Sequence, residues 1–134
     1  MRVSRSRVGA VAAFVALAFA LPASAVWTGV KETTVSCDGL TIKVGTTVDH
    51  AAYGDFKIDQ LETDPASTTW AIACVTGDVS RCLTWKPVSD GGTAVWTGVL
   101  ASSYTTYFYR SGSANCNGWL PGHGNYLLKY RVWY

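Results

Sequence analysis

The chain has 134 residues, with 11 Lys or Arg against nine Asp or Glu and a formal net charge of +2. Arg2, Arg5 and Arg7 all lie within the first 25 residues, so the rest of the chain is slightly acidic. This balance argues against a strongly basic nucleic-acid-binding protein. The length is that of one small domain, too short for two ordinary hydrophobic cores.

The first 25 residues have the pattern of a secretory signal peptide. Three arginines precede an uncharged run at 8–21, and Pro22 then leads into Ala23-Ser24-Ala25, a small-x-small cleavage site. A retained membrane anchor would need about 20 apolar residues, and this run is shorter. We therefore expect residues 1–25 to be removed and residues 26–134 to form one secreted domain that does not contact the membrane.

Short β-strand patterns follow the leader. Strands are predicted, from alternating apolar residues or from β-branched and aromatic residues, at 40–45, 55–59, 68–75, 81–86, 93–101, 104–110 and 126–134. Pro87 should end the fourth strand, and Ser102-Ser103 should form a turn. A single helical turn is predicted at 47–53, closed by Gly54. The chain should be all-β: an antiparallel β-sandwich or a flattened barrel.

Several large side chains are predicted to be buried by their place in these patterns. Trp70 falls on one face of a strand whose two faces are both apolar, and Tyr126 and Tyr130 belong to the apolar face of the last strand. His50 continues the register of the apolar side chains at 42 and 44, which favours a partly buried structural histidine. Asp49 and His50 should point to opposite faces of a strand, so they do not form a catalytic pair.

The four cysteines, Cys37, Cys74, Cys82 and Cys116, all follow the leader. An even number in a small exported domain predicts two disulfides, whereas a zinc site would require closer cysteine pairs. Three pairings are possible, and we favour Cys74–Cys82 with Cys37–Cys116. A hairpin loop at 77–79 would place Cys74 opposite Cys82. No metal or other cofactor is expected.

The pentapeptide Val-Trp-Thr-Gly-Val occurs twice, at 26–30 and at 95–99. The second copy lies too near the end of the sequence for a full tandem duplication. The two copies could occupy equivalent positions in paired sheets. Chance in a β-rich composition is the interpretation that we favour.

The binding candidates are a long loop and two aromatic residues beside turns. Segment 111–125 is rich in Gly and Asn, and it contains Asn117, Trp119 and His123. Loops longer than about 12 residues are often functional. Trp85 and Tyr53 also lie beside turn residues and should be exposed. The alternative is that Trp119 turns inward and caps the core.

Motifs for catalysis are missing from the sequence. It has no Gly-x-Ser-x-Gly elbow, no His-Glu-x-x-His motif and no phosphate-binding loop, and its only histidines are His50 and His123. The sequence therefore predicts a secreted, monomeric, non-enzymatic binding module for an extracellular protein or polysaccharide. The alternative is a secreted protease inhibitor or an antagonistic toxin, and a hydrolase is the least favoured class.

Overall fold

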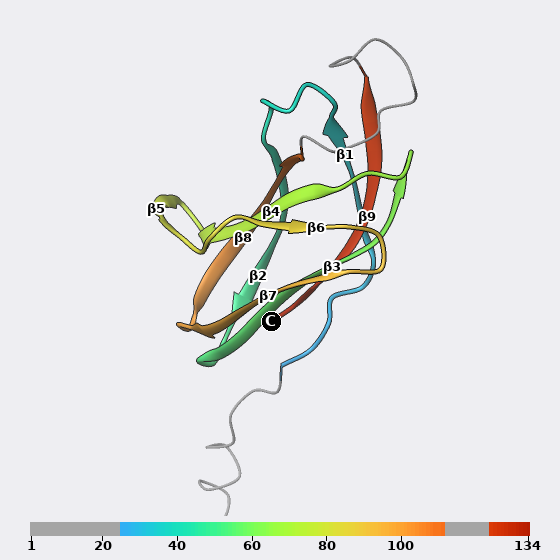
Figure 1. Ribbon diagram of the computed structural model, residues 1–134. Helices are drawn as coiled ribbons and strands as arrows, with labels where there is room; N and C mark the ends of the chain where they lie inside the picture. Colours follow the sequence, from blue (N-terminus) through green and yellow to red (C-terminus); the bar gives the residue numbers. More distant parts are fainter. Residues whose placement is uncertain (1–24, 112–123) are drawn as a thin grey trace, which may run out of the picture.

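The computed structural model describes residues 25–111 and 124–134, which contain nine β-strands and no helix (Figure 1). The strands are β1 (Lys31–Ser36), β2 (Lys43–His50), β3 (Gly54–Asp64), β4 (Thr69–Val75), β5 (Asp78–Cys82), β6 (Lys86–Val88), β7 (Thr93–Val99), β8 (Ser102–Arg110) and β9 (Asn125–Trp133). The all-β prediction is confirmed.

The strands form two antiparallel sheets that pack as a sandwich, which confirms the predicted architecture. One sheet has four strands in the order β1-β9-β3-β7. The other has five strands, in the order β2-β8-β4-β5, with β6 also paired to β4. Most neighbours in a sheet are therefore distant in sequence, so the pairing depends on the tertiary structure.

The core between the sheets is apolar and rich in aromatic residues. Its largest fully buried side chains include Phe56, Ile58, Phe108, Tyr126 and Leu128. The Tyr126 hydroxyl is 2.8 Å from that of Thr69 on the facing sheet. Tyr130 accepts a hydrogen bond from the Thr46 main-chain N–H, also at 2.8 Å. Burial raises the pKa of both phenols.

The region around β2 differs from the sequence prediction. The strand begins only at Lys43, and the side chains of Leu40, Ile42 and Val44 are exposed, to 86% for Leu40. The predicted helical turn at 47–53 is wrong, since the strand continues to His50. A register shift between Val44 and Thr47 explains the difference in burial, because one extra residue reverses the face of every later side chain. This register shift directs the His50 side chain into the core.

Three further strand predictions also differ from the structure. Strand β1 was not predicted, because its Lys, Glu and Thr residues carry little apolar alternation. Pro87 does not end a strand but lies within β6, opposite Trp70 of β4. Proline is tolerated there because β6 lies at the edge of its sheet. Residues 102 and 103 start β8 rather than forming a turn.

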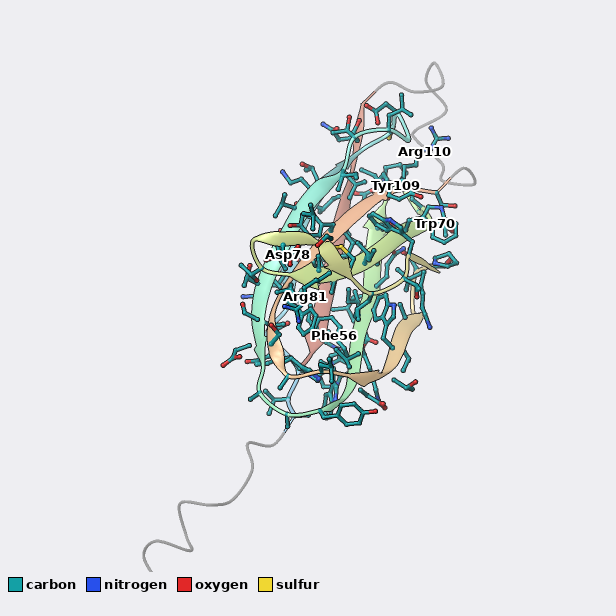
Figure 2. The ribbon with its side chains drawn as sticks, turned by 90° about the vertical axis from the view of Figure 1, so that its left-hand side faces the viewer. Phe56, Trp70, Asp78, Arg81, Tyr109 and Arg110 are labelled. Carbon is teal, nitrogen blue, oxygen red and sulfur yellow. A yellow bond between two sulfur atoms is a disulfide. The ribbon has the colours of Figure 1, made fainter. Side chains whose placement is uncertain are left out.

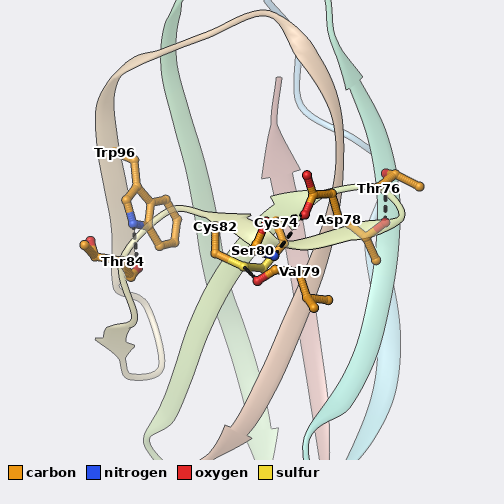
Figure 3. The surroundings of a disulfide bond; sticks show 9 residues. Cys74, Thr76, Asp78, Val79, Ser80, Cys82, Thr84 and Trp96 are labelled. Carbon is orange, nitrogen blue, oxygen red and sulfur yellow. Dashed lines mark hydrogen bonds between the residues drawn. A yellow bond between two sulfur atoms is a disulfide. The ribbon is translucent and has the colours of Figure 1, made fainter.

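The Cys74–Cys82 disulfide is confirmed, by a different hairpin from the predicted one (Figure 3). Val75 pairs with Asp78, so the turn is at Thr76 and Gly77, and residues 79–81 bulge out before Cys82 pairs with Cys74. Gly77 has a φ of 79°, which suits the turn. Cys37 is also disulfide-bonded, and its predicted partner, Cys116, lies outside the described residues.

The two pentapeptide copies lie in different surroundings within one sheet. In the first copy, Trp27 forms a bridge with Trp133 at the end of β9, and its indole is only half-buried. In the second copy, Trp96 of β7 is buried in the core. The copies are thus not equivalent positions in paired sheets, and the interpretation of a chance repeat stays a prediction.

Candidate functional site

The outer face of the five-stranded sheet carries a group of aromatic side chains. Trp70 of β4 pairs directly with Tyr109 of β8, and Ile72 pairs with Tyr107. Alternate residues of a strand share a face, so these four side chains all point away from the core. Their other neighbours are Pro87 opposite Trp70 and Val44 opposite Tyr107. These two rows of cross-strand neighbours contain no charged residue.

The aromatic rings contact one another. The ring planes of Trp70 and Tyr109 are nearly parallel, at 19°, with centroids 6.3 Å apart. Trp85, from the segment between β5 and β6, meets Tyr109 edge to face at 4.7 Å. All three side chains are half-buried. Figure 2 views the molecule from this side, with Trp70 and Tyr109 next to each other and Asp78 on the nearby hairpin. The rings therefore form one preorganised aromatic surface.

A shallow apolar groove of about 270 Å³ adjoins the rings. It is lined by Ile42, Ile72, Val79, Trp85 and Tyr107 and by the Cys74–Cys82 disulfide. Val79 reaches it because residues 79–81 bulge from the hairpin. The disulfide fixes the position of this hairpin, and thus one wall of the groove.

The other half of the same face carries hydroxyl groups. Thr105 of β8 is 2.9 Å, oxygen to oxygen, from both Thr47 of β2 and Thr76 of the hairpin turn. Thr76 also contacts the Ser103 hydroxyl at 2.9 Å. Hydroxyl groups both donate and accept hydrogen bonds. The cross-strand rows that carry these hydroxyl groups contain one charged side chain, Asp49, which lies opposite Ser103.

The outer face of the four-stranded sheet is different, because several of its charged groups form ion pairs. Lys129 lies between Glu32 and Glu62, at 3.8 and 3.5 Å, and the Arg131 Nε donates to Asp59 at 2.8 Å. The Arg131 guanidinium also lies 4.2 Å from the centre of the Trp27 ring. Cations thus cover aromatic rings here, whereas no Lys or Arg within 25–111 and 124–134 lies over the rings of the opposite face.

The structure separates the predicted binding residues. Trp85 belongs to the aromatic surface, although it is half-buried. Tyr53 is 70% exposed and lies in the loop between β2 and β3, with its hydroxyl close to Gly98. Asn117, Trp119 and His123 lie outside the described residues. A role of any of these residues in binding stays a prediction.

The sequence analysis missed Trp70, Tyr107 and Tyr109. Trp70 was assigned to the core, but its indole is half-buried on the outer face. The alternation along β8 does indicate an outward pair of tyrosines. Tyr107 and Tyr109 occupy odd-numbered positions on one face of the strand, and the buried Tyr104 and Phe108 occupy even-numbered positions on the other. The pattern separates the two faces of the strand, but it does not say which residues of β4 lie beside these tyrosines.

Asp49 and His50 point to opposite faces of β2, as predicted, and His50 is fully buried rather than partly buried. Its Nε2 is 3.1 Å from the Val99 carbonyl oxygen, so it donates there, and the ring packs against Phe56 and Tyr104. Within the described ranges, no three His, Cys, Asp or Glu side chains are grouped as metal ligands would be. The same ranges hold no helix with the length and hydropathy of a membrane span.

No protein family model matches the chain, and no curated protein sequence matches it significantly. The disulfide is compatible with an extracellular protein.

Proposed function

We propose that the protein is a secreted, non-enzymatic module that binds an uncharged extracellular polysaccharide on the outer face of the five-stranded sheet. The observation that carries the proposal is the contrast between the two outer faces. On the face of the four-stranded sheet, charged side chains form ion pairs and a cation lies over an indole ring. On the face of the five-stranded sheet, no cation of the described residues lies over the rings of Trp70, Trp85 and Tyr109, which remain partly accessible.

Sugar chemistry fits both halves of this face. The C–H groups of a pyranose ring form an apolar surface that packs against the flat side of an indole or phenol ring. The hydroxyls of Thr47, Thr105 and Thr76 can exchange hydrogen bonds with those of a sugar. Among the described residues, no Lys or Arg lies over these rings, which favours a neutral glycan over an acidic one, since an acidic chain would need cationic partners.

Affinity electrophoresis in gels containing neutral glucan, xylan or mannan tests the proposal directly, with sedimentation on insoluble polysaccharide as a second format. Trp70→Ala and Trp85→Ala each remove one ring of the surface. Trp27→Ala is the matched control, because it removes an indole of similar exposure from the opposite face. We expect about a 10-fold loss of affinity for each of the first two variants, about 1.4 kcal/mol, and none for the control.

Thermal unfolding of the same variants separates binding from folding. Equal losses of affinity in all three variants would refute the location of the site. Failure of every neutral glycan to bind, together with stoichiometric inhibition of a protease or killing of bacteria, would replace the proposal by the inhibitor or toxin alternative. Release of reducing sugar ends during incubation would show that the module is an enzyme.

A further inference from the structure

A small acidic cavity lies at the end of the sandwich where β2 passes into β3. Its volume is about 160 Å³, and Ala25, Asp49, His50, Tyr53, Asp55 and Trp133 are among its lining residues. Two of these carry carboxylates, and none of the residues that line the cavity is Lys or Arg. Both aspartates are exposed, so this end of the sandwich carries negative charge.

His50, on the opposite face of β2 from Asp49, places a buried acceptor at the same end of the sandwich. Its Nε2 donates to the Val99 carbonyl, so the neutral ring carries its proton there and Nδ1 is left with a lone pair. Nδ1 is buried and has no hydrogen-bond partner. A buried acceptor without a donor is costly, and such an atom in a native protein calls for an explanation.

The backbone enters the fold beside this cavity. The Val26 N–H donates to the main-chain oxygen of Tyr134 at 3.0 Å, and the Tyr134 N–H donates to the Val26 oxygen at the same distance. Thr28 continues the pairing, donating to Val132 at 2.8 Å. Ala25, which is exposed, precedes the first paired residue. The predicted cleavage site thus falls at the edge of the folded body.

We propose that this cavity binds the α-ammonium group that forms on Val26 when the peptide bond after Ala25 is hydrolysed. The inference rests on the predicted cleavage and not on the proposed polysaccharide binding. The C–N bond breaks, the oxygen of one water forms the Ala25 carboxylate, and both hydrogens of that water end on the Val26 nitrogen. The amide has a single N–H, which Tyr134 uses, whereas the ammonium has two more for Asp49, Asp55 or His50. Loss of Ala25 also vacates part of the cavity wall.

Processing should therefore stabilise the mature fold in a pH-dependent way. An α-amino group has an ordinary pKa of about 7.7–8.0, and nearby carboxylates favour its charged form in the folded state. The titratable groups that line the cavity are Asp49, His50, Tyr53, Asp55 and Tyr134. A pKa raised by folding gives stability below about pH 8 that is lost as the pH rises through the folded value.

The experiment compares mature protein beginning at Val26 with the same protein acetylated on the Val26 nitrogen. The acetyl group takes the place of the Ala25 carbonyl, so the comparison changes the charge and preserves the contact with Tyr134. We expect the free amine to raise the melting temperature by about 3 °C at pH 6.5 and by nothing at pH 10. Asp49→Asn combined with Asp55→Asn should remove most of the difference.

Each outcome decides the proposal. Equal melting temperatures at pH 6.5 would overturn it, as would a difference that survives at pH 10 or in the Asp49→Asn/Asp55→Asn protein. Mass spectrometry of the secreted product must also give Val26 as its first residue, and another start would overturn it. No glycan takes part in these measurements, so their failure is distinct from failure of the proposed function.

Discussion

Cys74 and Cys82 are direct cross-strand partners with Cα atoms 3.9 Å apart, although Cys74 is buried and Cys82 is exposed. The bridge spans the two sides of the hairpin at the point where residues 79–81 have bulged out. It therefore holds together the hairpin that supplies Val79 to the apolar groove. Its removal should affect both stability and the shape of the proposed site.

Cys74→Ala combined with Cys82→Ala should lower the free energy of unfolding by about 2–3 kcal/mol, the chain-entropy expectation for a loop of this size. Urea unfolding measures the change, and affinity for the glycan should fall as well because the groove loses a fixed wall. An unchanged urea midpoint would show that the bulged hairpin is held by its other contacts alone.

Gly45 lies where no side chain fits. A Cβ built at this position would be 2.4 Å from the Thr106 hydroxyl oxygen and 2.6 Å from the Phe108 ring. Gly45→Ala should therefore cost about 1–3 kcal/mol of stability through overpacking. Gly29→Ala is the matched control, since its Cβ would meet nothing within 4 Å. Chemical denaturation of both variants checks the difference, and equal midpoints would contradict it.

Asp38 caps the turn that follows β1. Its carboxylate accepts hydrogen bonds from the Thr41 side chain and from the main-chain N–H groups of Thr41 and Leu40, which lower its pKa to about 2. Since folding lowers this pKa, the stabilisation is complete above about pH 4 and is lost as the pH falls through the folded value.

Thr41→Val should raise the Asp38 pKa toward its ordinary value, because the largest cause of the shift is removed. Thr41→Ser keeps the hydroxyl and should leave the pKa low. An NMR titration of the Asp38 carboxyl carbon between pH 1.5 and 5 distinguishes the two variants. The same pKa in both would mean that the main-chain donors alone determine it.

Asp90 satisfies two polar side chains of β3. Its Oδ1 accepts from the Gln60 Nε2 and from the Thr63 hydroxyl, both at 2.8 Å, and Gln60 is fully buried. Asp90→Ala should cost about 1–3 kcal/mol, because buried donors lose an acceptor. Glu62→Ala should cost less than about 1 kcal/mol, since its ion pair with Lys129 is exposed. Thermal unfolding compares the two, and a smaller loss at Asp90 would contradict the prediction.

The fold class could be predicted because apolar and polar residues alternate along the strands that supply most of the core. Phe56 and Ile58 of β3, and Leu128 and Val132 of β9, are buried as their period predicts. The prediction failed around β2, where a bulge reverses the face of the strand between Val44 and Thr47. A bulge depends on the partner strand and leaves no mark in local hydropathy.

The candidate site was only partly predictable for a related reason. Trp85 was identified beside a turn, but the surface that it joins depends on the pairing of Trp70 with Tyr109, 39 positions apart. Trp70 was assigned to the core because both faces of its strand are apolar. Which of those faces meets the other sheet is a property of the packing.

The residues alone predicted that this chain is built of strands, and their spacing favoured a bridge between Cys74 and Cys82, both of which the structure confirms. Such features depend on side-chain periodicity, turn residues and local spacing, which neighbouring positions encode. Only the tertiary structure decided which face of each sheet points outward, and so gathered uncharged rings on one side and paired charges on the other. That choice depends on contacts between distant strands, whose pairing no short stretch of sequence specifies.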